Sequence, residues 1–213
     1  GTGLNSIDVS YAKKNKIKVF NSPKAFVESV TVYTFGMIIN LSRGIFKMHS
    51  EILENKWKKY SGIELKNKKL GIIGFGNIGQ NIAKIGKSFG MKILINDIDK
   101  HKIYKSRKIG YKSCSKKAIL NNSDFLVLAT DLNPKSFHLI DNKDFKEMKK
   151  NIIIVNISRG PVMSDKALLN NLNKNIGGLG LDVFENEPLS RNHKIKKFHN
   201  VVLWKRGKNS AEN

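Results

Sequence analysis

The chain of 213 residues is 40% hydrophobic, which suffices for one sizeable packed domain, or for one domain and part of another. No apolar run reaches the ~18 residues of a membrane helix, and no metal-ligand spacing stands out. The single cysteine, Cys114, excludes an internal disulfide and favours a reducing compartment, the cytoplasm. The formal net charge of +22 predicts weak, salt-dependent attraction to polyanions, but lysines scattered along the whole chain indicate no specific nucleic-acid site.

The chain begins with a short irregular region and a long helical pattern. Residues 1–20 predict a loop, a short helix and a strand that ends at Ile17–Phe20, and the sequence NSP at 21–23 interrupts the pattern. Residues 25–48 then predict one long helix, because apolar residues recur on one face at helical spacing: Phe26, Val30, Tyr33, Met37 and Leu41.

From residue 69 onward, short apolar runs alternate with helical patterns. Such alternation is typical of βαβ units and of a buried parallel sheet. The predicted strands cover 69–73, 91–96, 124–129, 151–156, 178–182 and 200–203, and the predicted helices cover 77–89, 143–149 and 164–172.

Three glycines lie in the spacing G-x-G-x-x-G between the first two of these strands. Gly74 permits a tight turn out of the strand, Gly76 leaves room for a pyrophosphate, and Gly79 lets the next helix pack against the sheet. The helix begins around Asn77 and Ile78, so its amino-terminal N–H groups are available to phosphates. Strand, loop and helix in register predict a dinucleotide site rather than an ordinary glycine turn.

Asp97 ends the second strand. Dinucleotide-binding units have an acidic residue ~20 residues after the glycine loop, and the spacing from Gly74 to Asp97 is close to that. A carboxylate there accepts hydrogen bonds from the adenosine ribose and repels a 2′-phosphate. The sequence therefore predicts NAD rather than NADP as the cofactor. The alternative is an ordinary strand-end acid with no ligand.

Several segments resemble one enzyme family. NISRGPV at 156–162 and GLDVFENEP at 180–188 resemble signature segments of the D-isomer-specific 2-hydroxyacid dehydrogenases. Segments at 1–23, 26–43, 57–79 and 138–160 are similar to the same family, so the resemblance extends from residue 1 to about residue 203. Within the family, these segments are most similar to the branch that oxidises D-3-phosphoglycerate in serine biosynthesis.

The resemblance implies an α/β fold, namely a doubly wound parallel Rossmann sheet that binds NAD, with a remnant of a flavodoxin-like substrate domain. Residues 1–24 would be that remnant, 25–203 the NAD-binding domain with its long linking helix, and 204–213 an atypical tail. In the family the active site lies between the two domains, and the NAD domain makes the contacts of a homodimer. The substrate is a small 2-hydroxy acid.

The resemblance also implies roles for individual residues. Arg159 would bind the substrate carboxylate with its guanidinium fork and polarise the neighbouring carbonyl. Glu187 would orient a catalytic histidine and raise its pKa, while Asp182 would contact the nicotinamide end and Ile157 and Ser158 would line it. The alternative for Arg159 is an ordinary surface arginine. The alternatives for Glu187 and Asp182 are a solvated acid before a proline and a strand-end cap, respectively.

The histidine that the family uses as general acid and base has no counterpart here. Where the family reads Thr-Pro-His, this chain has Trp204, Lys205 and Arg206. A guanidinium keeps its proton at any working pH and does not replace an imidazole. The sequence therefore predicts an incomplete, inactive chain, the product of a truncated or frame-disrupted gene. The remaining histidines are predicted to be surface or structural groups: His49, His101, His138, His193 and His199.

Three functions remain open on the sequence. The first is an NAD-dependent D-2-hydroxyacid dehydrogenase, of the phosphoglycerate type and incomplete. The second is a non-catalytic module that binds NAD and dimerises. The third is a basic nucleic-acid binder, which has only its charge in its favour.

Overall fold

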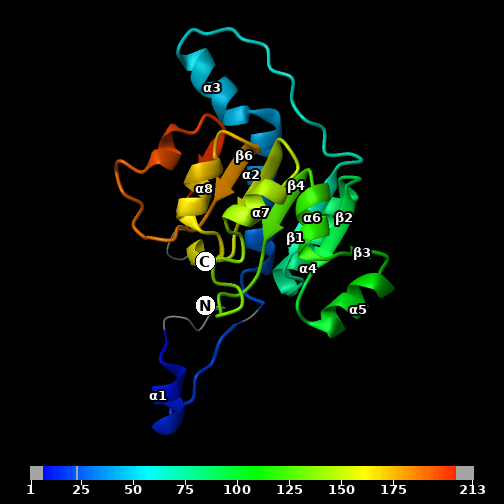
Figure 1. The fold of residues 1–213 in the computed structure, drawn as a ribbon, viewed down its shortest axis with the longest axis vertical. Helices are drawn as coiled ribbons and strands as arrows, with labels where there is room; N and C mark the ends of the chain where they lie inside the picture. Colours follow the sequence, from blue (N-terminus) through cyan, green and yellow to red (C-terminus); the bar gives the residue numbers. More distant parts are fainter. Residues whose placement is uncertain (1–6, 23, 205–213) are drawn as a thin grey trace.

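In the computed structural model, which describes residues 7–22 and 24–204, the strands form one sheet with helices on both faces (Figure 1). The sheet has seven strands in the order β3-β2-β1-β4-β5-β6-β7, and every neighbouring pair is parallel. This confirms the predicted α/β fold and its doubly wound order. The strands are β1 (Lys69–Ile73), β2 (Lys92–Asn96), β3 (Lys112–Ser113), β4 (Phe125–Leu128), β5 (Ile152–Asn156), β6 (Ile176–Leu181) and β7 (Val201–Leu203).

Helices connect the strands and cover the sheet. In the first part of the chain they are α1 (Val9–Lys14), α2 (Val27–Arg43), α3 (Ile45–Leu53), α4 (Asn77–Ser88) and α5 (Lys100–Lys108). In the second part they are α6 (Lys116–Asn122), α7 (Asn142–Glu147) and α8 (Asp165–Asn171), with short 3₁₀ turns η1 (Gly160–Val162) and η2 (Lys194–Lys197).

Two apolar clusters hold these layers together. On one face, Ile38 of α2 and Ile82 of α4 are fully buried against the sheet. On the other face, Ile119 of α6, Phe145 of α7 and Leu168 of α8 are equally buried. The central strands are buried on both faces, which explains why they read as continuous apolar runs rather than as alternating patterns.

The prediction of one helix over residues 25–48 is wrong. α2 ends at Arg43, and Gly44 takes a left-handed conformation (φ +67°) before α3 begins at Ile45. The carboxamide oxygen of Asn40 accepts a hydrogen bond from the Phe46 N–H at 2.9 Å and fixes the bend. Apolar periodicity does not register a glycine that ends a helix in this way.

The predicted strand at Ile17–Phe20 is also wrong, because these residues form no strand. Phe20 is 85% exposed, and α1 stands away from the sheet in Figure 1. A strand needs a hydrogen-bonded neighbour, and none of the described residues pairs with this segment.

The other predicted strands and helices form within one or two residues of the predicted bounds. The stretch from 97 to 123, for which we predict no element, holds α5, β3 and α6. α5 is lysine-rich and β3 has two residues, so neither carries a recognisable apolar period. None of the helices in the described part of the chain combines the length and apolar character that crossing a membrane requires.

Candidate active site

The residues singled out from the sequence meet at one edge of the sheet. Gly74 follows β1, Asp97 follows β2, Ile157 follows β5 and Asp182 follows β6. All these strands are parallel, so the four positions lie at their carboxyl ends. The strand order reverses between β1 and β4, and open α/β sheets bind ligands in the crevice outside such a point.

Two of the three loop glycines are required by the fold itself. Gly74 has φ +101°, and a Cβ on it would lie 2.5 Å from the carbonyl oxygen of Ala129. A Cβ on Gly79 would lie 2.1 Å from the carbonyl oxygen of Gly74. These two glycines allow the turn to close between β1, β4 and α4.

No contact among the described residues requires a glycine at position 76. Its φ of −75° suits any residue, and a Cβ built on it meets no atom within 4 Å. As the N-cap of α4, it also lacks the side chain that usually caps a helix start. Open space beside an uncapped helix amino terminus is what a pyrophosphate needs, so the loop fits a dinucleotide.

The two residues after Gly76 begin the helix that faces this space. Asn77 is exposed and is the first residue of α4, and Ile78 is half-buried. This agrees with the helix start predicted from the sequence.

Asp97 ties the glycine loop to the end of β2. One carboxylate oxygen accepts a hydrogen bond from the Phe75 N–H at 2.7 Å, and the other accepts one from the Asp99 N–H at 2.8 Å. The Lys102 Nζ lies 3.7 Å away, and the side chain of Asp97 is only 7% exposed. A carboxylate has about four acceptor positions, so two backbone bonds leave capacity for ribose hydroxyls.

The turn after β5 holds Arg159 in a fixed frame. Asn156 accepts a hydrogen bond from the Ser158 N–H at 3.1 Å and donates one to the Arg159 carbonyl at 3.3 Å. The Ser158 hydroxyl donates to the Thr130 carbonyl, which links this turn to the end of β4. Ile157 and Ser158 are buried and Arg159 is half-buried. Asn156, which the sequence analysis did not single out, is the residue that organises this turn.

The loop after β6 lies directly against this turn. A Cβ on Gly160 would come within 1.8 Å of the Phe184 carbonyl oxygen, so the two segments touch along their backbones. Asp182 is buried, and its N–H donates to the Asn156 carbonyl at 3.3 Å. The structure therefore brings together Arg159 and the segment that carries Asp182 and Glu187.

Glu187 does not bind a histidine in the described residues. Its carboxylate is exposed and accepts a hydrogen bond from the Phe184 N–H at 3.0 Å, within its own loop. Trp204 follows β7 at the same edge, where its backbone N–H donates a hydrogen bond to the Leu181 carbonyl at 2.9 Å. Lys205, Arg206 and the rest of the predicted tail lie outside the described residues.

Two histidine–carboxylate pairs flank this region, and sequence reasoning missed both. The Nε2 of His138 lies 2.6 Å from one Glu185 oxygen, and the other Glu185 oxygen accepts from the Asp165 N–H at 2.7 Å. The Nε2 of His193 lies 2.8 Å from the Asp165 carboxylate. These contacts join the loops after β4, β5 and β6. No local spacing could have revealed them, since the partners are far apart in sequence.

The fold and the glycine loop define the class of dinucleotide-binding α/β domains. The family model described as D-isomer specific 2-hydroxyacid dehydrogenase, NAD binding domain, matches residues 35–204. The chain belongs to this family, and its cofactor is NAD. Within the described residues, no cluster of three or more histidine, cysteine or acidic side chains could hold a metal ion.

Relatives and solved structures agree with this assignment. A protein of Staphylococcus aureus (strain N315), provisionally named a 2-hydroxyacid dehydrogenase, is 36% identical over 209 residues. The match covers 95% of this chain and 65% of that protein, so the chain spans less than two thirds of its relative.

Matches to two solved structures each cover 95% of this chain and 66% of the matched chain. A D-lactate dehydrogenase from Aquifex aeolicus complexed with NAD and lactic acid is 29% identical, with a TM-score of 0.84. A phosphoglycerate oxidoreductase from Vibrio cholerae O395 is 27% identical, with a TM-score of 0.85.

Proposed function

We propose that this chain is the NAD-binding part of a D-2-hydroxyacid dehydrogenase and that NAD lies along the carboxyl edge of the sheet. The glycine loop with Asn77 and Ile78 would hold the pyrophosphate, and Asp97 the adenosine ribose. Ile157, Ser158 and Asp182 would line the nicotinamide. The observation that carries this proposal is Gly76, whose lack of a side chain is not required by any contact with the described residues.

Arg159 would bind the carboxylate of a 2-hydroxy acid. Its guanidinium is planar and always charged, and hydrogen bonds of Asn156 hold the Arg159 backbone at the carboxyl edge of the sheet. Paired N–H donors toward the carboxylate and the neighbouring oxygen would align the carbon that bears the hydroxyl and stabilise charge on that oxygen. Bound NAD supplies the acceptor for the hydride that leaves this carbon.

The reaction also releases the hydroxyl proton, and a base must accept it. In the family this base is a histidine, and Glu187 would orient it. Here Arg206 stands at the position of that histidine, and its guanidinium keeps its proton. Loss of a general base costs ~10²–10⁴ in rate. We propose that the 213 residues by themselves bind NAD without useful turnover.

For the substrate we propose 3-phosphoglycerate, which would place the complete enzyme in serine biosynthesis. The motif resemblance to that branch supports this choice, and so does the net charge of +22, because a positive field attracts a substrate with both phosphate and carboxylate groups. The single cysteine supports a reducing, cytoplasmic location.

For the domains we propose that residues 1–24 belong to the substrate domain, 25–203 to the NAD domain and 204–213 to an atypical tail. The exposure of Ile17 (55%) and Phe20 (85%) supports the first boundary, because apolar side chains of this size usually pack against a partner. The substrate domain would be flavodoxin-like.

A second candidate is a non-catalytic module that binds NAD and dimerises. None of the α3 residues is buried, even though several are apolar. The side chains of Phe46 and Leu53 are 56% and 71% exposed. An apolar helix surface of this kind suits a second copy of the chain. Sedimentation equilibrium of the chain and of a Phe46→Glu/Leu53→Glu variant tests this: a dimer that persists in the variant contradicts the α3 interface.

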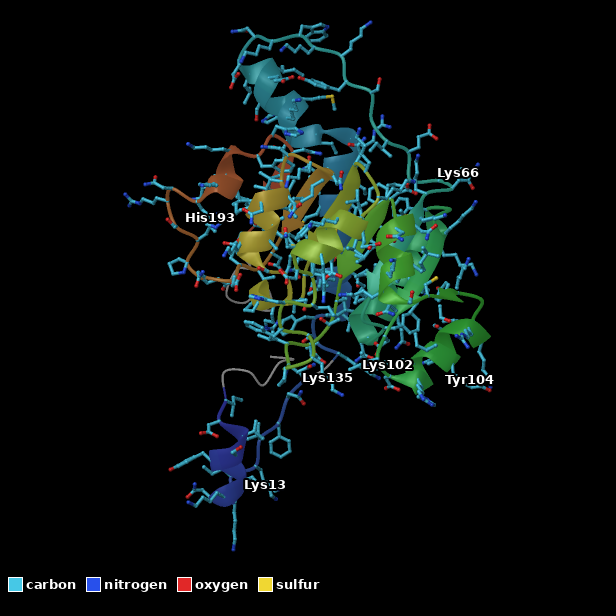
Figure 2. The ribbon with its side chains drawn as sticks, viewed as in Figure 1. Lys13, Lys66, Lys102, Tyr104, Lys135 and His193 are labelled. Atoms are coloured by element: carbon cyan, nitrogen blue, oxygen red, sulfur yellow. The ribbon has the colours of Figure 1, made fainter. Side chains whose placement is uncertain are left out.

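A specific nucleic-acid site finds no support in the arrangement of the lysines. In Figure 2, Lys13, Lys66 and Lys102 lie on widely separated parts of the molecule. Scattered cations produce salt-dependent attraction but no groove-matched surface.

The test of the proposed function is a titration with NADH. Trp204 lies beside Leu181 at the carboxyl edge, so quenching of its fluorescence should report binding, with Trp57→Phe removing the signal of the exposed second tryptophan. We expect saturable binding in the chain, tighter for NADH than for NADPH, and loss of binding in Gly76→Val. Equal binding by Gly76→Val would contradict the proposed site, and so would no binding at millimolar NADH.

A further inference from the structure

A cavity of about 470 Å³ lies at the edge of the sheet opposite the glycine loop. Lys69, Lys92 and Lys112 are the first residues of β1, β2 and β3, and all three line this cavity. The cavity begins at the amino ends of β1 and β2 and runs along β2 to Leu94, which pairs with Lys112, whereas Gly74 and Asp97 follow the carboxyl ends of β1 and β2. The cavity is therefore separate from the proposed NAD site.

The cavity exists because the sheet edge is only partly covered. β3 pairs with Leu94 and Ile95, so no strand of the described residues lies beside Lys92 and Ile93 on that side. The chain turns at Gly110, which has φ +84°, and the turn brings Tyr111 to the cavity wall.

The lining combines an apolar floor with a cationic rim. Met91, Ile93 and Leu94 are buried and form the apolar part with the Tyr111 ring. Among the residues that the structure describes, four lysines line the cavity and no aspartate or glutamate does: Lys69, Lys87, Lys92 and Lys112.

The lysines keep their charge available to a ligand. The Nζ of Lys69 lies 3.2 Å from the Asn122 side-chain oxygen, a neutral partner. The Nζ of Lys87 lies 5.9 Å from the centroid of the Tyr111 ring. Asp124 accepts a hydrogen bond from the Lys69 backbone N–H at 2.8 Å, and its carboxylate is paired with the Lys149 Nζ at 2.6 Å. Unneutralised ammonium groups around an apolar floor match an anion with an apolar body.

We propose that this cavity binds a small amphipathic anion, with an aromatic or aliphatic body on the Met91–Leu94 floor and a carboxylate, phosphate or sulfonate head between the lysines. The proposal does not depend on the dehydrogenase function, because it concerns the other edge of the sheet.

The first test uses anilinonaphthalene sulfonate, whose fluorescence rises in apolar surroundings, at ~0.15 M salt, where the Debye length of ~8 Å suppresses distant attraction. We expect one saturable site per chain, no displacement by excess NAD, and no displacement by an equal concentration of inorganic phosphate, which lacks an apolar body. Lys92→Glu/Lys112→Glu should weaken binding at least about tenfold, because two attractive charges become repulsive. Lys59→Glu/Lys166→Glu changes the net charge equally at exposed positions outside the cavity and should bind as the unmodified chain does.

The second test uses Cys114, the single cysteine of the chain, which lines the cavity. Saturating probe should slow its alkylation by iodoacetamide several-fold in the unmodified chain and not in Lys92→Glu/Lys112→Glu. Circular dichroism checks that both double variants fold. Equal weakening in the two double variants, several probe molecules per chain, displacement by NAD, or unprotected Cys114 would each overturn the proposal.

Discussion

The α-carbon of Gly160 lies so close to Phe184 that a Cβ on it would come within 1.8 Å of the Phe184 carbonyl oxygen. The turn that carries Arg159 and the loop that carries Glu187 thus meet backbone to backbone. Only a glycine permits this approach. The atoms that a Cβ would meet belong to the backbone, which cannot move aside as a flexible side chain could.

We therefore expect Gly160→Ala to destabilise the fold by about 1–3 kcal/mol, the usual cost of overpacking. Urea unfolding measures the change. Gly36→Ala is the matched control, because Gly36 is exposed within α2 and a Cβ there meets no atom within 4 Å. That change should raise stability by about 0.5–1 kcal/mol through helix propensity. Equal changes in the free energy of unfolding for the two substitutions would contradict the close backbone approach of Gly160 and Phe184.

The glycine loop predicts a separation of stability from binding. Gly79→Ala should destabilise by about 1–3 kcal/mol, because its Cβ would lie 2.1 Å from the Gly74 carbonyl oxygen. Gly76→Val should cost at most about 1 kcal/mol, the difference between glycine and a β-branched residue at an N-cap, while abolishing NADH binding. Thermal unfolding and NADH titration of the same two samples make the comparison. A destabilisation by Gly76→Val larger than that by Gly79→Ala would show that the fold itself requires Gly76.

Asp124 ties the amino ends of β1 and β4 together and predicts a pH dependence. Burial raises the pKa of its carboxyl, but the hydrogen bonds from Lys149 and the Lys69 N–H and the charges of Lys149 and Lys68 outweigh burial and hold the pKa below its ordinary value. A carboxyl with a lowered pKa in the folded state stabilises the fold above its unfolded pKa, and this contribution is lost as the pH falls through the folded value.

Asp124→Asn should therefore lower stability at pH 7 by about 1 kcal/mol, the usual scale of a hydrogen bond. The difference from the unmodified chain should shrink as the pH falls below about 4, near the ordinary aspartate pKa. Urea unfolding at several pH values measures it. A difference that stays constant down to low pH would assign the loss to packing rather than to charge.

The pair of His138 and Glu185 predicts a measurable coupling. Their side chains are 33% and 22% exposed, and Glu185 also accepts the Asp165 N–H, so the pair clamps three loops. A double-mutant cycle with His138→Ala and Glu185→Ala should give a coupling energy of about 0.5–1.5 kcal/mol.

The control for this cycle is the pair of Lys117 and Glu147, whose side chains are 71% and 42% exposed. An exposed pair of this kind is worth about 0–1 kcal/mol, and here we expect the low end. Equal coupling in the two pairs would mean that the clamp contributes no more than a surface contact.

Local pattern predicts a residue well where the physical cause is local. The glycine spacing places Gly74, Gly76 and Gly79 at the loop, and α4 begins at Asn77 as predicted. The same reasoning fails at Gly44, because apolar spacing continues past a residue whose left-handed conformation ends the helix. It also fails at Phe20, because strand propensity does not supply a pairing partner.

The sequence by itself determined the parallel α/β class, the glycine loop and the family, because apolar runs, glycine spacing and signature segments are properties of neighbouring residues. Only the tertiary structure decided that Gly160 touches Phe184, that Glu185 binds His138, and that a lysine-rimmed cavity opens beside β2. These features join residues far apart in the chain. They arise because parallel strands collect their loops at shared edges of the sheet, which no local spacing records.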